Sequence, residues 1–391
     1  MAASAVVGNN LDTVRRHNLS TVLGLVHRSG TRSRSELTRV TGLNRSTIAA
    51  LVGELVERGL VTESVPEEKN GVGRPSPVVG AHPGVLALAV NPEVDAVTVG
   101  VIGLDGTLLR RVRHATETMP TANEAVVIAA AVIDGLRVEL GAASHVVGIG
   151  AAIPGLVRES DGVVRLAPHL TWVDEPFADM LADATGLPVL AANDANLGVG
   201  AEHLFGAGRG VSDLVYINGG ASGIGAGVIT GGVPLAGISG YAGELGHTLV
   251  NSAGVRCHCG AIGCLETEVS QRSLLAVLGL ETADADELER ELAASADPRV
   301  RDEVERQLRF LAVAVRNATN VFNPELIVLG GFLRALLSAA PGRLDELVAS
   351  AALGASGESL RIARAELGTN VLMIGAAERA FERVLADPGA F

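Results

Sequence analysis

A stretch rich in glycine and proline, residues 71–83, divides the sequence into two parts of different character. Before it, apolar residues recur at helical spacing. After it, short runs of valine, isoleucine, leucine and alanine alternate with helical segments. Neither a helix nor a central strand tolerates this density of glycine and proline, so the stretch predicts a domain boundary. We expect a small unit over residues 1–80 and a larger one over residues 81–391, and 391 residues are enough for each to bury a core.

The larger unit has the pattern of an α/β domain. The expected strands cover residues 85–90, 97–102, 146–152, 189–192, 214–218 and 224–229, and the expected helices cover 123–140, 174–185, 303–321 and 375–386. Strands followed by helices predict a largely parallel sheet, and the length indicates two lobes. We expect lobe one over residues 81–192 plus 375–391 and lobe two over 193–374. The polar segment 281–300 is expected to be exposed helix and loop.

The smaller unit contains a helix-turn-helix pattern. A first helix ends at Gly30, and Ser33 with Glu36 has the spacing of a capping box that starts a short helix through Val40. After a tight turn at residues 41–43, Asn44 can cap a longer helix over residues 44–58. Its expected core face consists of Ile48, Leu51, Val52, Leu55 and Val56. Two helices across a short glycine-containing turn form a helix-turn-helix.

Two short strands are expected to follow these helices and to complete a winged unit. Residues 60–63 and 76–79 can pair around the loop 66–75, which would be the wing. In this loop Arg74 lies between Gly73 and Pro75, so a restrained backbone could present its guanidinium to a narrow minor groove.

The residues at the start of the second helix suit contacts with DNA bases. Early positions of such a helix meet base edges, and here they are Arg45, Ser46 and Thr47. Arg34, together with Arg32 and Arg39 nearby, could contact phosphates. The first 80 residues hold ten basic and seven acidic residues, whereas the remainder holds 21 basic and 37 acidic ones, so nucleic acid is expected at the N-terminus alone. The alternative is a small three-helix unit that mediates dimerisation or has no binding role.

All three cysteines of the chain, Cys257, Cys259 and Cys264, lie within eight residues, which excludes a scattered disulfide framework. His247 precedes the first of them, Cys257, by ten residues. Three thiolates and one imidazole make a closed tetrahedral shell for a structural Zn²⁺. His258 is a competing ligand, although its place between two cysteines makes joint coordination awkward. A reducible disulfide between Cys257 and Cys264 is the alternative.

Four polar residues stand where an apolar sequence has no structural need for them. Asn193 and Asp194 follow the expected strand 189–192, Glu244 lies three residues before His247, and Glu266 lies two after the last cysteine. Amides and carboxylates suit the recognition of sugar hydroxyls, each of which donates and accepts a hydrogen bond. Any one of them alone could be a helix cap or a surface residue, so the hypothesis rests on their joint placement.

These motifs resemble those of the ROK family of repressors and sugar kinases, over nearly the whole chain. The residues Gly-Glu-Leu-Gly-His247 and Cys-His-Cys-Gly-Ala-Ile-Gly-Cys-Leu-Glu266 resemble the family signature, and Asn193-Asp194-Ala-Asn196 resembles its sugar and catalytic motif. The residues Gly-Leu-Asn-Arg-Ser-Thr-Ile and the Gly-Arg-Pro of the wing are similar to the DNA-binding unit of its repressor branch.

The resemblance implies a fold and a set of roles. The fold would be a winged helix-turn-helix followed by a two-lobed actin-like ATPase (ribonuclease H-like) domain, with a ligand in the cleft between the lobes. Asn193, Asp194, Glu244, His247 and Glu266 would bind sugar hydroxyls, and His247 would also ligate zinc through its other ring nitrogen. Zinc would then hold the loop that presents His247 and Glu266. In a kinase, Asp194 would be the general base.

The turn after the first strand of the larger unit separates a regulator from a kinase. The kinases of the family carry an Asp-x-Gly-Gly-Thr type turn there, whose bare N–H groups approach phosphate. Here the residues are Asn91-Pro92-Glu93-Val94-Asp95-Ala96: a proline removes a donor and a glutamate adds repelling charge. Two glycine-rich segments, 219–227 and 330–331, still resemble nucleotide loops, although tight turns need glycine with or without ATP. The sequence favours a non-enzymatic regulator, with a glucokinase-like kinase retaining a DNA-binding arm as the alternative.

The expected protein is a sugar-responsive regulator, a repressor of genes for carbohydrate uptake or catabolism. It would bind a palindromic operator as a homodimer or homotetramer, under control of a sugar or sugar phosphate. No apolar run approaches the 18 residues of a membrane span, and the N-terminus lacks a signal pattern, so a cytoplasmic protein without membrane contact is expected.

Overall fold

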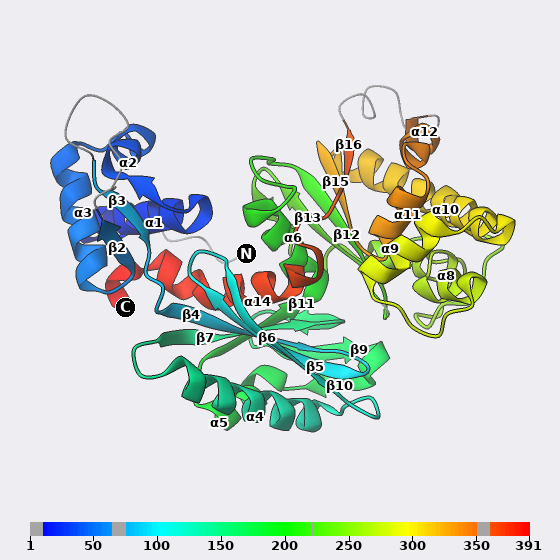
Figure 1. Cartoon of the computed structure of the whole chain (residues 1–391), viewed down its shortest axis with the longest axis horizontal. Helices are drawn as coiled ribbons and strands as arrows, with labels where there is room; N and C mark the ends of the chain where they lie inside the picture. Colours follow the sequence, from blue (N-terminus) through cyan, green and yellow to red (C-terminus); the bar gives the residue numbers. More distant parts are fainter. Residues whose placement is uncertain (1–10, 65–75, 221, 350–359) are drawn as a thin grey trace.

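The N-terminal unit is a helix-turn-helix with a small antiparallel sheet (Figure 1). The computed structural model describes residues 11–64, 76–220, 222–349 and 360–391. The helices are α1 (Leu11–Ser29), α2 (Arg34–Thr41) and α3 (Arg45–Glu57), and the strands β1 (Arg32–Ser33), β2 (Val61–Ser64) and β3 (Val78–Ala81) pair in the order β1-β3-β2. The predicted wing loop 66–75, with Arg74, lies outside the described residues.

Local capping signals set the ends of the helices in this unit. Ser33 Oγ accepts a hydrogen bond from Glu36 N and Glu36 accepts one from Ser33 N, which confirms the capping box. Asn44 caps α3 by accepting from the backbone N–H of Thr47 at 2.8 Å, as predicted. Val56, predicted in the core, is 40% exposed, so that prediction is wrong. Eight residues after Ile48, it lies about 80° around the helix and faces outward.

The first lobe contains a five-stranded sheet in the order β11-β7-β4-β5-β6. Its strands are β4 (Val85–Pro92), β5 (Ala96–Gly103), β6 (Leu108–Ala115), β7 (His145–Ile153) and β11 (Val189–Asn193). The prediction of a largely parallel sheet is wrong, because β4, β5 and β6 pair antiparallel while β7 pairs parallel with β4 and β11. The links between β4, β5 and β6 are short turns that leave no room for the crossover a parallel pair requires.

Helices cover both faces of this sheet. The helices α4 (Ala122–Leu140) and α5 (Phe177–Thr185) pack on one face, and α6 (Asp194–Phe205) and α14 (Val371–Ala386) pack on the other. The helix expected from residue 174 begins at Phe177 instead, because Trp172–Glu175 forms β10. This strand belongs to a small sheet in the order β10-β9-β8, with β8 (Leu156–Arg158) and β9 (Val163–Ala167).

The second lobe contains another five-stranded sheet, in the order β14-β13-β12-β15-β16. Its strands are β12 (Leu214–Gly220), β13 (Gly223–Thr230), β14 (Val233–Pro234), β15 (Leu326–Gly331) and β16 (Arg361–Arg364). Its helices are α7 (Leu265–Glu268), α8 (Gln271–Leu278), α9 (Ala285–Ala294), α10 (Pro298–Phe322), α11 (Leu333–Ala339) and α12 (Arg343–Ala349). The amphipathic α10 buries a long apolar face against this sheet. Within the segment expected to be exposed, α9 buries Leu288 and Leu292.

The C-terminal helix α14 connects the three parts of the molecule. It lies against β4 and β7 of the first sheet, against α6, and against α1 of the N-terminal unit (Figure 1, red). Glycine makes the close packing possible: a Cβ built at Gly150 in β7 would lie 1.6 Å from the carbonyl oxygen of Ala376. None of the helices in the described ranges has the length and apolar character that crossing a membrane requires.

Candidate functional site

The structure brings the five predicted sugar-binding side chains around one cavity of about 490 Å³. The cavity lies between the lobes. The first lobe contributes the end of β11 and the loop before β8, and the second contributes β13, the segment before the 3-10 helix η2 (Leu245–His247), and α7. The residues that line it include Asn193, Asp194, Glu244, His247 and Glu266. The volume suits a small polar ligand.

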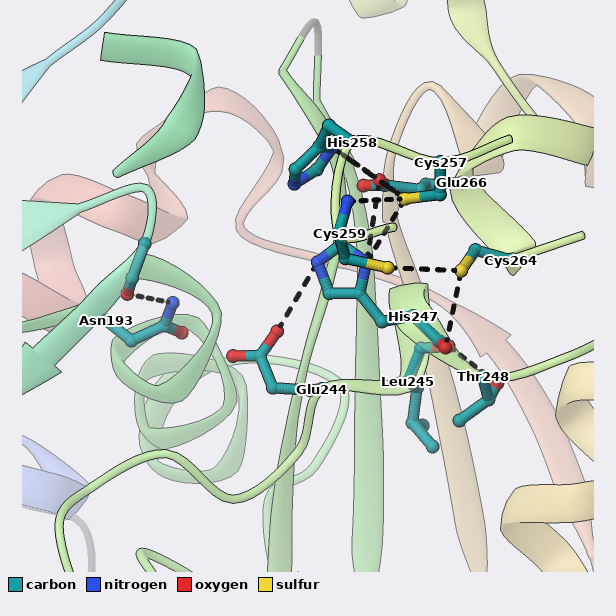
Figure 2. Close-up of polar contacts among 11 residues, drawn as sticks. Asn193, Glu244, Leu245, His247, Thr248, Cys257, His258, Cys259, Cys264 and Glu266 are labelled. Atoms are coloured by element: carbon teal, nitrogen blue, oxygen red, sulfur yellow. Dashed lines mark hydrogen bonds and ion pairs between the residues drawn. The ribbon is translucent and has the colours of Figure 1, made fainter. Parts of the chain in front are cut away.

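Asn193 and Asp194 form the junction between β11 and α6. The Asn193 side chain caps α6, since its Oδ1 accepts from Asn196 N at 3.0 Å, and its Nδ2 donates to the carbonyl oxygen of Gly155 at 3.0 Å (Figure 2). Asp194 Oδ1 accepts from Ala195 N at 2.8 Å. Both side chains therefore have structural partners, and each retains further hydrogen-bonding capacity toward the cavity.

Two acidic groups of the cavity, Asp194 and Glu244, have raised pKa values. Burial raises the pKa of Asp194 to about 7, an effect that its backbone hydrogen bond opposes and the charge of Glu244 strengthens. Burial also raises the pKa of Glu244; His247 opposes this shift and Glu266 adds to it. Perturbed carboxyl groups that converge on a cavity indicate a functional site.

The four predicted metal ligands lie together beside the cavity. The candidate ligand atoms of His247, Cys257, Cys259 and Cys264 are all within 4.8 Å of one another. The Cys259 and Cys264 sulfurs are 3.7 Å apart, and Cys257 Sγ is 3.6 Å from His247 Nδ1. Tetrahedral Zn²⁺ with Zn–S bonds near 2.3 Å requires sulfurs roughly 3.8 Å apart. The donor set therefore fits a metal ion, and the cysteines form no disulfide.

His247 lies between Glu244 and the cysteine sulfurs (Figure 2). Its Nδ1 faces Cys257, while its Nε2 is 4.0 Å from Glu244 Oε2 on the side of the cavity. One imidazole can thus hold a metal ion with one nitrogen and meet a ligand with the other. The resemblance implied these two roles for His247, which stay a prediction.

Tight turns hold the cysteine loop in place. Gly263 has φ +73°, and a Cβ there would lie 1.6 Å from the carbonyl oxygen of Asn251. The loop closes on itself through hydrogen bonds from Gly260 N to the Cys257 carbonyl and from Cys257 N to the Ala261 carbonyl. Only glycine can occupy position 263 without moving the neighbouring backbone.

His258 lies closer to this cluster than its place between two cysteines led us to expect. Its Nδ1 is 3.0 Å from Glu266 Oε1 and 3.8 Å from Cys257 Sγ. Glu266 Oε1 also accepts from Cys257 Sγ at 3.0 Å. His247, Cys257, His258 and Glu266 therefore form a second possible ligand set, which shares two residues with the first.

Several cavity residues escaped the sequence analysis. Asn218 lines the cavity from β12, Ser222 lines it from the position just before β13, and His169 lines it from the 3-10 helix η1 (Pro168–Leu170). Burial lowers the pKa of His169. Asn218 and His169 stand in no motif of the sequence. Ser222 lies in the glycine-rich segment 219–227, whose resemblance to a nucleotide loop did not indicate this cavity. All three residues reach the cavity only through the fold.

The helix-turn-helix residues lie at the surface to different degrees. Arg45 and Ser46 are exposed, Thr47 is partly buried, and Ser46 Oγ donates to Asn44 Oδ1 at 2.7 Å. Arg34 pairs with Glu63 of β2, with Nη2 donating to Oε2 at 2.6 Å. A phosphate contact by Arg34 would therefore have to compete with this ion pair.

Comparison with known proteins identifies the chain. The ROK family model matches residues 88–382. The chain belongs to the ROK family. Residues 20–70 match the MarR family model, which places a MarR-type winged helix before the ROK domain.

Two members of this family, a repressor and a transcriptional regulator, match almost the whole chain. The chain is 28% identical over 382 residues to the xylose repressor of Caldicellulosiruptor bescii, covering 91% of this chain and 93% of that one. A crystal structure of a ROK family transcriptional regulator, a homolog of the E. coli MLC protein, matches with TM-score 0.77 and 27% identity over 96% of this chain and 97% of that one. This match confirms the predicted fold.

A kinase of the family matches a smaller part of the chain. The ROK family glucokinase of Streptomyces griseus, solved with glucose and AMPPNP, matches with TM-score 0.64 and 28% identity. The match covers 98% of the glucokinase but 75% of this chain, so about a quarter of this chain has no counterpart there. The repressor and regulator matches extend over almost all of it.

Proposed function

We propose that the chain is a sugar-responsive transcriptional regulator, a repressor of genes for carbohydrate uptake or catabolism. The observation that carries the proposal is the combination, in one chain, of an exposed helix-turn-helix with an interlobe cavity lined by all five candidate sugar ligands. The similarity to a repressor over more than nine tenths of both chains supports it. Such a protein acts on DNA in the bacterial cytoplasm.

In this proposal each domain has a separate function. Residues 1–80 bind DNA and residues 81–391 bind the sugar, with lobe one formed by 81–192 and 375–391 and lobe two by 193–374. Arg45, Ser46 and Thr47 read bases in the major groove, Arg34 contacts phosphate, and Arg74 reaches the minor groove. A homodimer or homotetramer places two α3 helices on a palindromic operator.

The sugar acts by closing the cleft. Asn193 and Asp194, at the boundary between the lobes, bind its hydroxyls together with Glu244, His247 and Glu266 of lobe two. Lobe one lines the opposite wall of the cavity through Gly155, Leu156 and His169, which supports a ligand that draws the lobes together. The sugar can change DNA binding only through a difference in its affinity for the open and closed states.

We propose that His247, Cys257, Cys259 and Cys264 hold a structural Zn²⁺. Three thiolates and an imidazole leave no open position for water, which is the pattern of a structural site. The ion would fix the loop that presents His247 and Glu266 to the sugar.

We further propose that the chain is not a kinase. The β4–β5 turn supports this: Glu93 N donates to the Ala96 carbonyl at 2.7 Å, and the carboxylates of Glu93 and Asp95 both face Arg113. A phosphate would meet two carboxylates there instead of free N–H groups. The glycines of the two segments that resemble nucleotide loops, 219–227 and 330–331, permit close packing of the backbone. A Cβ at Gly331 would lie 1.9 Å from the carbonyl oxygen of Gly219.

The kinase alternative rests on Asp194, which stands where a general base would act. A coupled assay that detected sugar-dependent release of ADP from ATP would favour it over the regulator.

Operator binding tests the proposal. Genome-wide mapping of bound sites supplies the operator, and gel-shift assays then compare the variants with the unaltered protein. Replacing both candidate base- and groove-contacting arginines, Arg45→Ala with Arg74→Ala, should weaken operator affinity by about tenfold or more, because each good base contact contributes about 1–3 kcal/mol. Arg111→Ala, an exposed arginine on β6, is the control and should leave affinity unchanged. Unchanged affinity in the double variant would refute the DNA-binding role.

Sugar sensing has a separate test on the same operator. Asn193→Ala and Glu244→Ala should retain DNA binding and lose the response to the sugar. An intact response in both variants would show that the effector binds elsewhere.

A further inference from the structure

The wall of the cavity that belongs to the first lobe carries an imidazole with an unused nitrogen. His169 lines the cavity from η1, directly after β9. Its Nε2 is shielded from solvent and has no hydrogen-bond partner among the residues that the structure describes. A buried polar atom without a partner costs free energy, so such atoms are rare unless water, an ion or a ligand completes them.

The Nε2 atom of His169 and the carboxylate of Glu266 both lie beside Gly223, which belongs to the second lobe. A Cβ built at Gly223, the first residue of β13, would lie 2.5 Å from Glu266 Oε2 and 3.7 Å from His169 Nε2. The His258 ring lies 5.1 Å from the His169 ring, edge to face, and its Nδ1 is 3.0 Å from Glu266. His169 therefore faces, across the cleft, the loop that the metal cluster holds.

The charges of the cavity restrict what it can hold. Its lining contains the carboxyl groups of Asp194, Glu244 and Glu266, and no lysine or arginine among the described lining residues. A phosphate ester or a sugar acid would meet these carboxylates without a guanidinium or ammonium group to pair with it. Hydroxyl groups, by contrast, can donate to carboxylates and either donate to or accept from an imidazole nitrogen.

We propose that His169 is a further ligand-contacting residue and that the ligand is an uncharged sugar, one hydroxyl of which bridges His169 and Glu266. The inference rests on the proposed function, because it takes this cavity as the effector site. Since His169 belongs to the first lobe and Glu266 to the second, the bridged hydroxyl joins the two lobes across the cavity. His169 thereby links recognition of the sugar to the closed state.

Calorimetric titration of the full-length protein tests this inference. The probes are a set of uncharged pentoses and hexoses, the corresponding sugar phosphates, and the corresponding uronic acids. An uncharged sugar should bind at least about 30-fold more tightly than its phosphate and its acid, because like charges in contact without pairing cost several kcal/mol.

Variants test the residue itself. His169→Ala should weaken binding of the uncharged sugar by about five- to tenfold, the contribution of one hydrogen bond. His169→Gln, which keeps a donor and an acceptor, should recover most of the affinity, whereas His169→Leu, which is of similar size but cannot form a hydrogen bond, should not. His114→Ala, an exposed histidine on β6, is the control. Far-UV circular dichroism and the melting temperature establish that each variant is folded.

The outcomes separate this inference from the proposed function. Tighter binding of a phosphate or an acid, or unchanged affinity in His169→Ala, would overturn the inference. If Asn193→Ala still abolished binding of whichever ligand bound most tightly, the cavity would remain the sensing site. Binding by none of the three sets, or binding that Asn193→Ala left unchanged, would refute the sugar-sensing function itself and this inference with it.

Discussion

A buried histidine from the DNA-binding unit holds that unit to the ROK domain. His27, in α1, has a side chain only 1% exposed; its Nε2 lies 2.8 Å from Glu378 of α14, and its Nδ1 contacts the carbonyl oxygen of Leu104. The ring also packs edge to face against Phe205 and Phe381. Because both ring nitrogens face acceptors, both must carry protons, and we expect His27 to be charged in the folded protein.

The charge makes the contact dependent on pH. Burial lowers the pKa of His27, but the charge and hydrogen bond of Glu378 and the bond to Leu104 outweigh burial and raise the pKa above its usual 6.5. A group with a raised folded pKa contributes stability that is fully present below the unfolded value and is lost as pH rises through the folded value. The contact should therefore stabilise the protein at pH 6 and contribute little at pH 9.

The substitution Glu378→Gln isolates this contribution. Glutamine keeps the shape and can bond a neutral imidazole, so the loss is the difference between a charge-assisted and a neutral hydrogen bond, about 1–2 kcal/mol. At pH 6 the variant should be less stable than the unaltered protein by that amount. At pH 9 the difference should vanish or reverse, because a neutral His27 leaves one nitrogen facing an acceptor without a proton.

Urea unfolding at pH 6, 7.5 and 9 measures the effect. The single tryptophan, Trp172, is buried in the first lobe, and its fluorescence should be compared with far-UV circular dichroism to test for one transition. Glu382→Gln is the control on the same helix, since Glu382 is 53% exposed and pairs with Arg379. A loss in Glu378→Gln that stayed constant from pH 6 to pH 9 would show that His27 is not charged and would refute the reasoning.

Three further predictions concern the cavity and the metal loop. Gly263→Ala should reduce the free energy of unfolding by at least about 2 kcal/mol, because the new methyl would meet a carbonyl oxygen and φ is +73°. Gly260→Ala, with φ +95° and no atom within 4 Å, should cost about 1 kcal/mol by the same urea assay, and equal losses would contradict the packing argument. Asp194→Asn should raise the free energy of unfolding at pH 8, on the order of 1–3 kcal/mol, and should not raise it at pH 4. The reason is that the Asp194 carboxyl has a pKa of about 7 in the folded protein and a lower one in the unfolded chain. Between pH 4 and 7 the unfolded chain therefore releases a proton that the folded protein retains, and the unaltered protein loses stability as pH rises. A variant less stable than the unaltered protein at pH 8 would disprove this. Elemental analysis should find one zinc per chain, lost in Cys264→Ser and retained in His258→Ala, whereas loss in His258→Ala would favour the second ligand set.

Short-range signals in the sequence predicted the local structure well. The capping box at Ser33 and Glu36 and the cap at Asn44 were confirmed, because a cap depends on residues three positions apart. The grouping of His247 with the three cysteines was also predictable, since metal ligands are few and distinctive. The separation of a helical N-terminal unit from an α/β remainder followed from the glycine- and proline-rich stretch.

Contacts between distant segments were not predictable in this way. The direction of the strands was predicted wrongly, because alternation of strands and helices says nothing about which strands pair. The ion pair between Arg34 and Glu63 competes with the phosphate contact predicted for Arg34. This ion pair forms only when β2 packs beside α2.

By itself, the sequence determined the helix caps, the separation of the N-terminal unit from the α/β remainder and the grouping of His247 with the three cysteines, because each of these depends on residues near one another in the chain. The tertiary structure alone decided that His169 faces Glu266 across the cavity and that His27 meets Glu378, residues 97 and 351 positions apart. Their surroundings, and hence their hydrogen bonding and pKa, exist only after the lobes and the DNA-binding unit have packed together.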